Sequence, residues 1–168
     1  MRDYKEPEKE FSESVVEINR ISKKTKGGNQ IRFSALVVLG DKKGRVGLGN
    51  AKATDVRNAI RKAIEDAKKR MIKITMKGTT VSHSVRVKSG ASEVLIKPAP
   101  AGSGIIAGGP MRIVLESAGL RDVVGKSLGS NSKMGNIKAT IEALEMITFL
   151  SEKKSFQKNG LKSEKEAK

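Results

Sequence analysis

The sequence contains no cysteine and a single histidine among its 168 residues. Without cysteine the chain can form neither a disulfide framework nor a thiolate metal site, which suits a reducing cytosol. The lone His83 has no second histidine or cysteine with which to build a catalytic triad or a zinc site. The sequence therefore predicts no metal, no cofactor and no enzymatic activity.

Aromatic residues and long apolar runs are scarce as well. Aromatics make up 3% of the chain, so no platform for stacking the bases of single-stranded nucleic acid is expected. No apolar run approaches membrane-spanning length, the acidic N-terminus lacks a signal-peptide apolar region, and no basic helix carries an aromatic apolar edge. We therefore expect no membrane partner, and the 37% of hydrophobic residues predict an aliphatic core.

Positive charge, in contrast, is abundant. The chain has 34 Lys and Arg against 18 Asp and Glu, a formal net charge of +16. Residues 20–70 alone hold 15 basic and four acidic residues, a net charge of +11. Because so concentrated a charge repels itself, the composition favours a polyanionic partner and above all nucleic acid.

Residues 11–74 are predicted to form a small sheet with one helix on it. Apolar and polar residues alternate over residues 30–39, which is typical of a strand with one face in a core. Turn-forming residues follow at 40–44, and an apolar face resumes over residues 46–48. With a first strand at residues 15–21, the pattern predicts three strands.

A helix is predicted to follow these strands. Thr54 can cap it, Asp55 complements its dipole, and apolar residues from Val56 onward recur at helical spacing. Gly47 and Gly49 lie on the face of the preceding strand that carries no apolar side chains, where a partner's backbone can come close. The first domain is therefore β-β-β-α.

Residues 75–150 are predicted to form a second α+β domain of the order β-β-α-β-α. His83 is in phase with the valines around it, so we expect it to face the core. The expected elements are strands at 81–87, 94–96 and 123–124, a long loop at 97–109, a helix from Pro110 that stops at Gly119, and a last helix capped by Asn136. The charged residues 1–10 and 151–168 are predicted to be flexible tails.

The basic loop at residues 22–28 is the most informative local feature. Lys23, Lys24 and Lys26 project charge, and Gly27 and Gly28 let the backbone approach a phosphate. The alternative is an ordinary solvated hairpin connection, but the density of charge favours nucleic acid. A three-stranded sheet with a basic helix is similar to the double-stranded-RNA-binding domain, which recognises A-form shape through phosphates and 2′-hydroxyls.

Five motifs then identify a family. They are N-R-I-S-K-K-T-K-G-G at residues 19–28, F-S-A-L-V-V-L-G-D at 33–41, G-R-V-G-L-G-N-A-K-A at 44–53, K-P-A at 97–99 and G-S-G-I-I-A-G-G at 102–109. In this order they closely resemble small-subunit ribosomal protein five in its bacterial form, over residues 11–150. The resemblance implies a left-handed crossover in the second domain, against the usual hand.

The basic surface and the resemblance together give two sets of candidate residues. The expected RNA-binding residues are Arg20, Lys23, Lys24, Lys26, Gly27, Gly28, Asn29, Arg32, Arg45, Lys52, Arg57, Arg61, Lys97 and Lys126. The expected protein-interface residues are Gly102, Gly104, Ile105, Ile106 and Arg112. Arg112, early in its helix, would oppose the helix dipole unless a carboxylate or a phosphate of a partner balances it.

The resemblance also implies a function. A protein of this family would be a structural constituent of the cytoplasmic small ribosomal subunit that binds 16S ribosomal RNA, stabilises the head against the body and contributes to translational accuracy. The implied partners are that RNA, ribosomal proteins four and eight of the small subunit, and messenger RNA near its entry path. No homo-oligomer is expected.

Two other functions compete with this one. The first is a small-metabolite kinase-like phosphate-binding protein, because the fold expected for the second domain is similar to that of such enzymes, whose Gly-rich loop holds phosphate. A dinucleotide-binding pattern, G-x-G-x-x-A at residues 102–107 with Asp122 downstream, is a separate and weak match, since two prolines separate it from its strand. A near match to a phosphate loop at 119–127 has five residues between its glycines where four are needed, and a poor helix start after it. A near match to a KH loop at 44–47 is flanked by strands instead of helices. A free-standing RNA chaperone is the third possibility.

Overall fold

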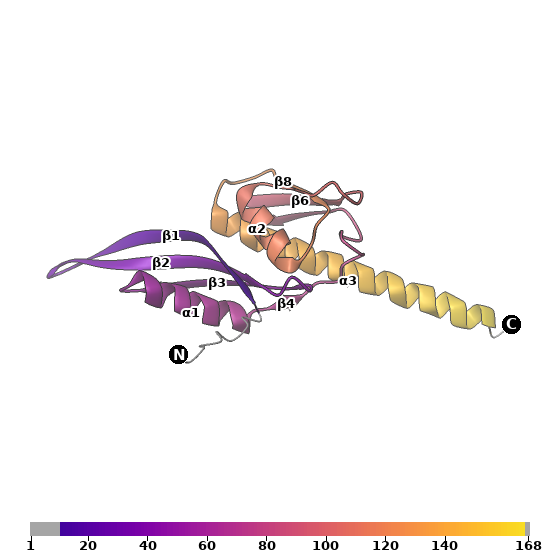
Figure 1. Cartoon of the computed structure of the whole chain (residues 1–168), viewed down its shortest axis with the longest axis horizontal. Coiled ribbons are helices and arrows are strands. Elements are labelled where there is room, and N and C mark those ends of the chain that lie inside the picture. Colours follow the sequence, from indigo (N-terminus) through magenta and orange to yellow (C-terminus); the bar gives the residue numbers. More distant parts are fainter. Residues whose placement is uncertain (1–10, 167–168) are drawn as a thin grey trace, which may run out of the picture.

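The computed structural model describes the backbone of residues 11–166 and the side chains of residues 11–153. It shows an elongated α+β molecule in which a long hairpin projects at one end and a long helix at the other (Figure 1). The elements are β1 (Ser12–Thr25), β2 (Gly28–Gly40), β3 (Arg45–Ala53), α1 (Val56–Lys69), β4 (Ile72–Lys73), β5 (Val85–Ser89), β6 (Ser92–Pro98), β7 (Ile105–Ile106), α2 (Gly109–Ala118), β8 (Val123–Ser127) and α3 (Lys133–Glu166).

The strands form two sheets of four. The first has the order β1-β2-β3-β4 and is antiparallel throughout. The second has the order β5-β6-β8-β7, in which only the β7–β8 pair is parallel. Both predicted domains are confirmed as α+β units, and each gains a short strand that the sequence pattern did not predict, β4 in the first and β7 in the second.

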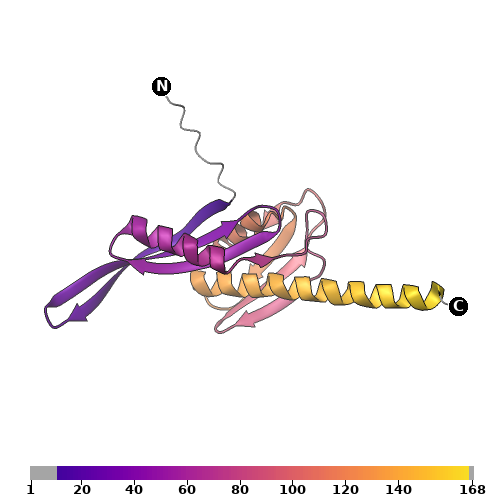
Figure 2. The same ribbon diagram turned by 90° about the horizontal axis from the view of Figure 1, so that it is seen from below.

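The β1–β2 hairpin is longer than the rest of its sheet. The two strands pair from Ser12 opposite Gly40 out to Thr25 opposite Gly28, with an irregularity between Val15 and Glu17. Strand β3 reaches only as far as Phe33 of β2, so the outer part of the hairpin is a free two-stranded ribbon (Figure 2). The first strand is therefore much longer than the predicted 15–21.

Strand β2 is buried on both faces over its second half. Ala35 and Val37 pack with Ala59 and Ala63 of α1, and the intervening residues of β2 pack into a core that belongs largely to the second domain. All five residues from 35 to 39 are 6% exposed or less. The prediction of one apolar face was wrong here, because a second layer covers the face that alternation assigns to solvent.

The glycines of β3 allow α1 to pack closely against this strand. A Cβ atom on Gly49 would lie 2.8 Å from the carbonyl carbon of Ala63 and 2.8 Å from the amide nitrogen of Ala67, and Gly47 is similarly close to α1. Real Cβ atoms do not approach other atoms so closely. Only glycine at these two positions of β3 therefore allows the alanine residues of α1 to pack against the strand. The predicted approach of an external partner at these glycines was wrong.

Both long helices of the prediction begin elsewhere than expected. The N-cap of α1 is Asp55 and not Thr54, and its carboxylate accepts a hydrogen bond from the Asn58 side chain at 3.2 Å. Helix α3 begins at Lys133, because Ser132 accepts the amide of Gly135 at 3.3 Å and so takes the capping role predicted for Asn136. In α2 the predicted stop at Gly119 is confirmed by its left-handed φ of 93°.

Helix α3 continues far past the predicted domain end. It runs to Glu166, through residues predicted to be a tail, and extends beyond the second sheet (Figure 1). Lys and Glu are good helix formers, so this charged segment extends the helix as a single rod. The predicted tail at residues 1–10 lies outside the described residues, as do the last two residues.

The segment before β5 departs from the predicted strand at residues 81–87. The carbonyl of Thr79 accepts hydrogen bonds from the backbone amides of Arg121 and Asp122 at 2.9 and 3.1 Å, and these bonds hold the segment in a turn. The strand starts only at Val85. His83 is half-buried, and its Nδ1 lies 2.9 Å from the Ser82 hydroxyl. The expectation of a core-facing histidine was therefore wrong.

Strand β7 makes the predicted loop at 97–109 part of the second sheet. The order β7-α2-β8 is a parallel crossover, with α2 packed against α3 and against the first domain. The predicted inward residues of α2, namely Met111, Val114, Leu115 and Ala118, are all buried. The left hand of the crossover remains an expectation of the resemblance.

Candidate nucleic-acid interface

The free end of the β1–β2 hairpin carries the predicted basic loop. Every residue from Ser22 to Arg32 is exposed. The turn closes where Thr25 donates its hydroxyl to the Gly28 carbonyl at 2.8 Å, and Gly28 has a φ of 128° that residues with a side chain rarely adopt. Strand geometry therefore holds the loop well away from the body of the protein.

Basic side chains lie on both faces of this ribbon. Residues directly opposite in an antiparallel pair share a face, so Lys24 lies on the face of Arg20, and Lys23 lies on the other face with Arg32. Asn29 is opposite Lys24. No ion pair is formed by these cations within the described part of the chain. The ribbon can therefore present unneutralised charge to two sides of a groove.

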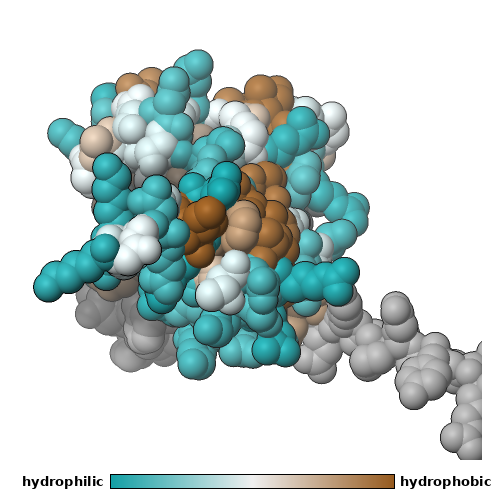
Figure 3. Space-filling model, turned by 90° about the vertical axis from the view of Figure 1, so that its left-hand side faces the viewer, coloured by the Kyte–Doolittle hydropathy of each residue, from teal (hydrophilic) through white to brown (hydrophobic). Residues whose placement is uncertain are grey.

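Figure 3 views the molecule from its hairpin end. Hydrophilic side chains surround this end, and hydrophobic side chains gather in its middle. The exposed large hydrophobic residues of the two hairpin strands are Val15, Ile18 and Ile31, each 40–44% exposed. The exposed lysines of the loop lie at the tip of the projecting hairpin (Figure 1), where they would meet a polyanion first.

A second group of cations lies where β3 ends and the hairpin continues alone. A pocket of about 380 Å³ there, which we call the corner pocket, is lined by Arg32, Lys52, Ala53, Thr54, Asn58, Arg61 and Lys62. These residues come from β2, from the end of β3 and from the first turns of α1. The structure thus brings together Arg32, Lys52 and Arg61 of the predicted set and adds Lys62, which the sequence pattern placed only on the polar face of a helix.

Other predicted RNA-binding residues lie apart from this group. Arg57 is exposed on α1 and does not line the corner pocket. Lys97 and Lys126 lie on neighbouring strands of the second sheet, where Lys126 is opposite Leu95, so both side chains are on the same outer face. These two lysines form a separate, small basic patch on the second domain.

Arg45, the first residue of β3, is bound to the turn that precedes it. Its Nε donates to the Asp41 carboxylate at 2.6 Å, and its guanidinium lies 5.5 Å from the centre of the Phe11 ring. Burial alone would raise the pKa of Asp41, but hydrogen bonds from the Arg45 side chain and from the backbone amides of Arg45 and Lys43 outweigh it and lower that pKa. Part of the Arg45 charge is therefore already neutralised.

The predicted protein-interface loop is closed by an internal carboxylate. Asp122 accepts the backbone amides of Gly102 at 2.9 Å and of Gly104 at 3.1 Å. The Thr79 hydroxyl and these two amides hold the pKa of Asp122 below its usual value, against the opposing effect of burial. The amides that would cradle a nucleotide phosphate are thus occupied by the aspartate that the G-x-G-x-x-A pattern assigns to a ribose.

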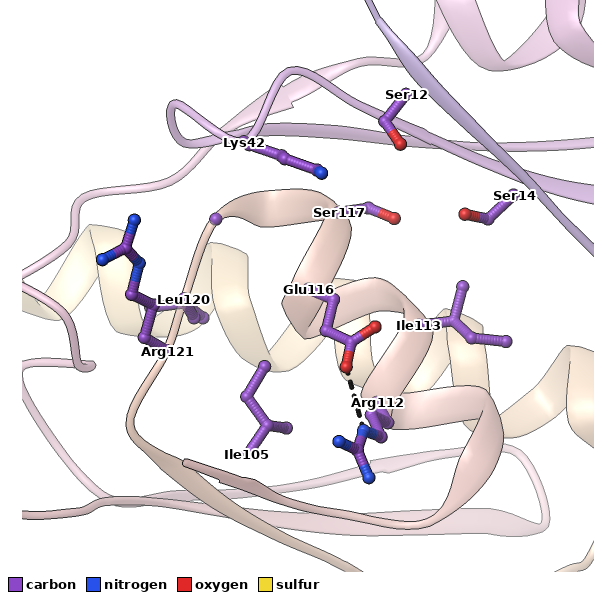
Figure 4. A pocket seen from close by; sticks show the side chains of 11 residues that line it. Ser12, Ser14, Lys42, Ile105, Arg112, Ile113, Glu116, Ser117, Leu120 and Arg121 are labelled. Carbon is purple, nitrogen blue, oxygen red and sulfur yellow. Dashed lines mark hydrogen bonds and ion pairs between the residues drawn. The ribbon is translucent and has the colours of Figure 1, made fainter. Parts of the chain in front are cut away.

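Two of the interface candidates face a groove between the domains. Ile105 and Arg112 line a groove of about 570 Å³, with Ser12 and Ser14 of β1 on one side and α2 on the other (Figure 4). Within α2, Arg112 forms an ion pair with Glu116 at 2.9 Å. The positive charge at the start of the helix is therefore balanced by a carboxylate of the same chain, whereas the prediction considered only a carboxylate or phosphate of a partner. Ile106 is 58% exposed and lies outside the groove.

The groove also contains two cations that the sequence pattern did not single out. Lys42 comes from the β2–β3 turn and Arg121 from the segment after α2. These positions are about 80 residues apart, so no local pattern could have joined them. The described residues include no group of three or more His, Asp or Glu placed to hold a metal ion, and none of the described helices has the length and apolarity to span a bilayer.

Comparison with protein families gives two matches. Residues 11–75 match the family described as Ribosomal protein S5, N-terminal domain, and residues 87–154 match Ribosomal protein S5, C-terminal domain. The first match contains the hairpin and the corner pocket, and the second contains the interface loop and α2. The bacterial form remains an expectation of the resemblance.

Proposed function

The chain belongs to the ribosomal protein S5 family, and from this premise we propose that it binds 16S ribosomal RNA and stabilises the head of the small subunit against the body. The family consists of structural, RNA-binding proteins of the cytoplasmic small subunit that act in translation and are not enzymes. Membership therefore removes the kinase-like alternative and disfavours a free-standing chaperone. One observation carries the RNA-binding proposal: unneutralised cations cover both faces of a projecting ribbon.

The proposed division of labour follows the two domains, with a boundary at residues 74 and 75. The first domain would contact RNA through Arg20, Lys23, Lys24, Lys26, Gly27, Gly28, Asn29, Arg32, Lys52, Arg57 and Arg61, with Arg45 as a weaker contributor. Lys97 and Lys126 would add a contact from the second sheet. Double-stranded RNA suits this surface better than single strands, because charge on two faces fits a groove and stacking aromatics are absent from the hairpin loop at residues 22–32.

The protein partners of the family are proposed at the other end. Ribosomal proteins are partners of this family, and we propose small-subunit proteins four and eight, with the loop and groove around Ile105 and Arg112 as the contact with protein four. Through this contact the chain would contribute to translational accuracy, and its position would bring it near the messenger entry path. The exposed Ile106 supports a contact that is completed only on assembly.

The salt dependence of RNA binding tests the main proposal. If about six phosphates are contacted, the plot of log affinity against log salt concentration should have a slope on the order of −4 to −5, because each contact releases condensed counterions. Filter binding of the full chain to a 16S ribosomal RNA fragment measures this slope. A slope near zero would show that phosphates do not dominate binding.

Substitution of Arg112→Asp tests the proposed protein contact. The isolated chain should stay folded and its stability should fall by at most about 0.5 kcal/mol, because the exposed pair with Glu116 contributes little and is replaced by a repulsive pair at the same spacing. In the assembled particle the backbone of residues 102–112 should exchange hydrogen faster than in the wild type. Equal protection of this segment in free and assembled wild-type protein would argue against docking.

A further inference from the structure

The corner pocket has an unusual charge balance. Four of its seven lining residues, Arg32, Lys52, Arg61 and Lys62, are cationic, and none is acidic. No ion pair involves any of the four within the described part of the chain. Asp55, the neighbour of Thr54 in the chain, does not line the pocket, and its carboxylate is bound to Asn58.

Such an arrangement is unfavourable without an anion. Four like charges around one small cavity repel each other, and mobile counterions screen that repulsion in the free protein. The pocket also lies at the first turns of α1, where unsatisfied backbone amides add positive partial charge. Thr54 and Asn58 supply further hydrogen-bonding groups. The helix end therefore adds to a site that side chains from three elements already build.

The composition of the pocket favours a phosphate group over a whole nucleotide. Its volume of about 380 Å³ is at the small end of the range for ligand sites. No aromatic side chain lines it to stack a base, and no carboxylate lines it to hold a magnesium ion. The planar guanidinium groups of Arg32 and Arg61 match the oxygens of a phosphate.

We propose that the corner pocket holds one phosphate of an RNA backbone, as a second anchoring point in addition to the hairpin loop. The proposal rests on the proposed function, and it names the ligand of one particular site. Gly28, the first residue of β2 after the loop, and Arg32 are four residues apart along an extended strand, so the base of the loop and the pocket are separated by roughly 13 Å. Phosphates of one duplex can reach both points, because a nucleic-acid duplex carries a charge every ~1.7 Å of its axis.

Two anchoring points have a mechanical consequence. Beyond Arg32 the hairpin is a two-stranded ribbon to which no third strand pairs (Figure 2), and such ribbons are marginally stable by themselves. A phosphate held at the base would fix the direction of the ribbon relative to α1. The corner pocket is thus a positioning site for the loop as well as a source of affinity.

The test compares two double variants of the full chain. In Arg61→Gln/Lys62→Gln two pocket cations become neutral, and in the control Lys68→Gln/Lys69→Gln two exposed cations at the other end of α1 become neutral. With a duplex RNA of about 16 base pairs, the pocket variant should bind about tenfold more weakly than the wild type, and the loss of one phosphate contact should make its salt slope less steep by about 0.7–0.9. The control should stay within about twofold of the wild type.

Phosphate-ethylation interference on the same RNA locates the contact. The wild type and the control should share every interfering phosphate, and the pocket variant should lose one position or one adjacent pair while keeping those made by the loop. A titration of wild-type protein with inorganic phosphate, followed by the amide signals of residues 54–58, tests for a free anion instead. Saturation by inorganic phosphate at micromolar concentration, with an unchanged interference pattern in the pocket variant, would overturn the assignment to an RNA phosphate.

The failures of the two proposals differ. If the wild type binds RNA with the expected salt slope but the pocket variant behaves like the control, only the corner-pocket inference is overturned. If the wild type itself shows no salt-dependent binding, the RNA-binding proposal fails first. Circular dichroism of each variant checks the fold, and unchanged thermal melting is expected because all four substituted side chains are exposed.

Discussion

Substitution of Gly119→Ala is expected to destabilise the protein by roughly 3 kcal/mol, through backbone strain and a steric clash together. The residue has a φ of 93°, in the left-handed region that favours glycine. A Cβ atom there would lie 2.5 Å from the carbonyl carbon of Lys42 and 3.0 Å from its Cα. Since these are backbone atoms of the other domain, they cannot move aside as the end of a flexible side chain can.

The clash would fall on the contact that joins the two domains. The β2–β3 turn donates the amides of Lys42 and Gly44 to the carbonyls of Ser117 and Ala118 at 3.1 and 2.9 Å. These carbonyls belong to the last turn of α2, which has no further helical residues to satisfy them. A Cβ at position 119 would therefore push the turn away and leave buried polar groups without partners.

Thermal and urea unfolding of the full chain measure the effect, and Gly90→Ala is the matched control. Gly90 also has a positive φ, of 60°, but no atom lies within 4 Å of its Cβ position, so the control isolates strain from clash. The control should be destabilised by about 1 kcal/mol. Equal destabilisation of the two variants would show that the clash at position 119 is relieved at no measurable cost, and the amide of Gly44 should then retain its protection from hydrogen exchange.

Charge reversal of the hairpin loop, Lys23→Glu/Lys24→Glu/Lys26→Glu, is expected to weaken RNA binding by on the order of 100-fold or more. Removal of each phosphate contact should make the salt slope less steep by about 0.7–0.9, so the removal of three changes it by more than about 2. The three side chains are exposed and take part in no ion pair of the described chain, so thermal stability should stay nearly unchanged.

A control of equal net charge separates local contact from overall attraction. Lys77→Glu/Lys88→Glu/Lys138→Glu makes the same change of six charge units at exposed positions of the second domain and its connection. Filter binding of both variants to the same 16S ribosomal RNA fragment provides the measurement. If the control weakened binding as much as the loop variant does, the hairpin would act only through the net charge of the protein.

The sequence was most informative where a property is local or additive. Net charge and its concentration in residues 20–70 need no structure, and the family follows from five motifs in their order. Helix α2 was predicted closely, since its inward residues recur at helical spacing and Gly119 supplies the backbone conformation that ends a helix. The β-β-β-α order of the first domain is likewise a consequence of periodicity and turn chemistry.

Predictions failed where a remote segment set the environment of a residue. Alternation in β2 assigns one face to solvent, but the second domain covers that face at Leu36 and Val38. Gly49 was assigned to an external partner because the sequence does not reveal which helix packs on the strand. Asp122 matched a nucleotide-binding pattern, yet only the folded chain shows that its carboxylate takes the amides of Gly102 and Gly104.

The candidate site likewise has one part that the sequence predicted and one part that only the structure shows. The loop lysines could be found from the sequence, because a hairpin turn exposes its residues whatever the rest of the chain does. The corner pocket could not, because Arg32, Lys52 and Arg61 converge only when β3 stops short of the hairpin end and α1 packs back over the sheet. Periodicity specifies which side of its own element a residue occupies, and tertiary packing alone decides which other elements that side meets.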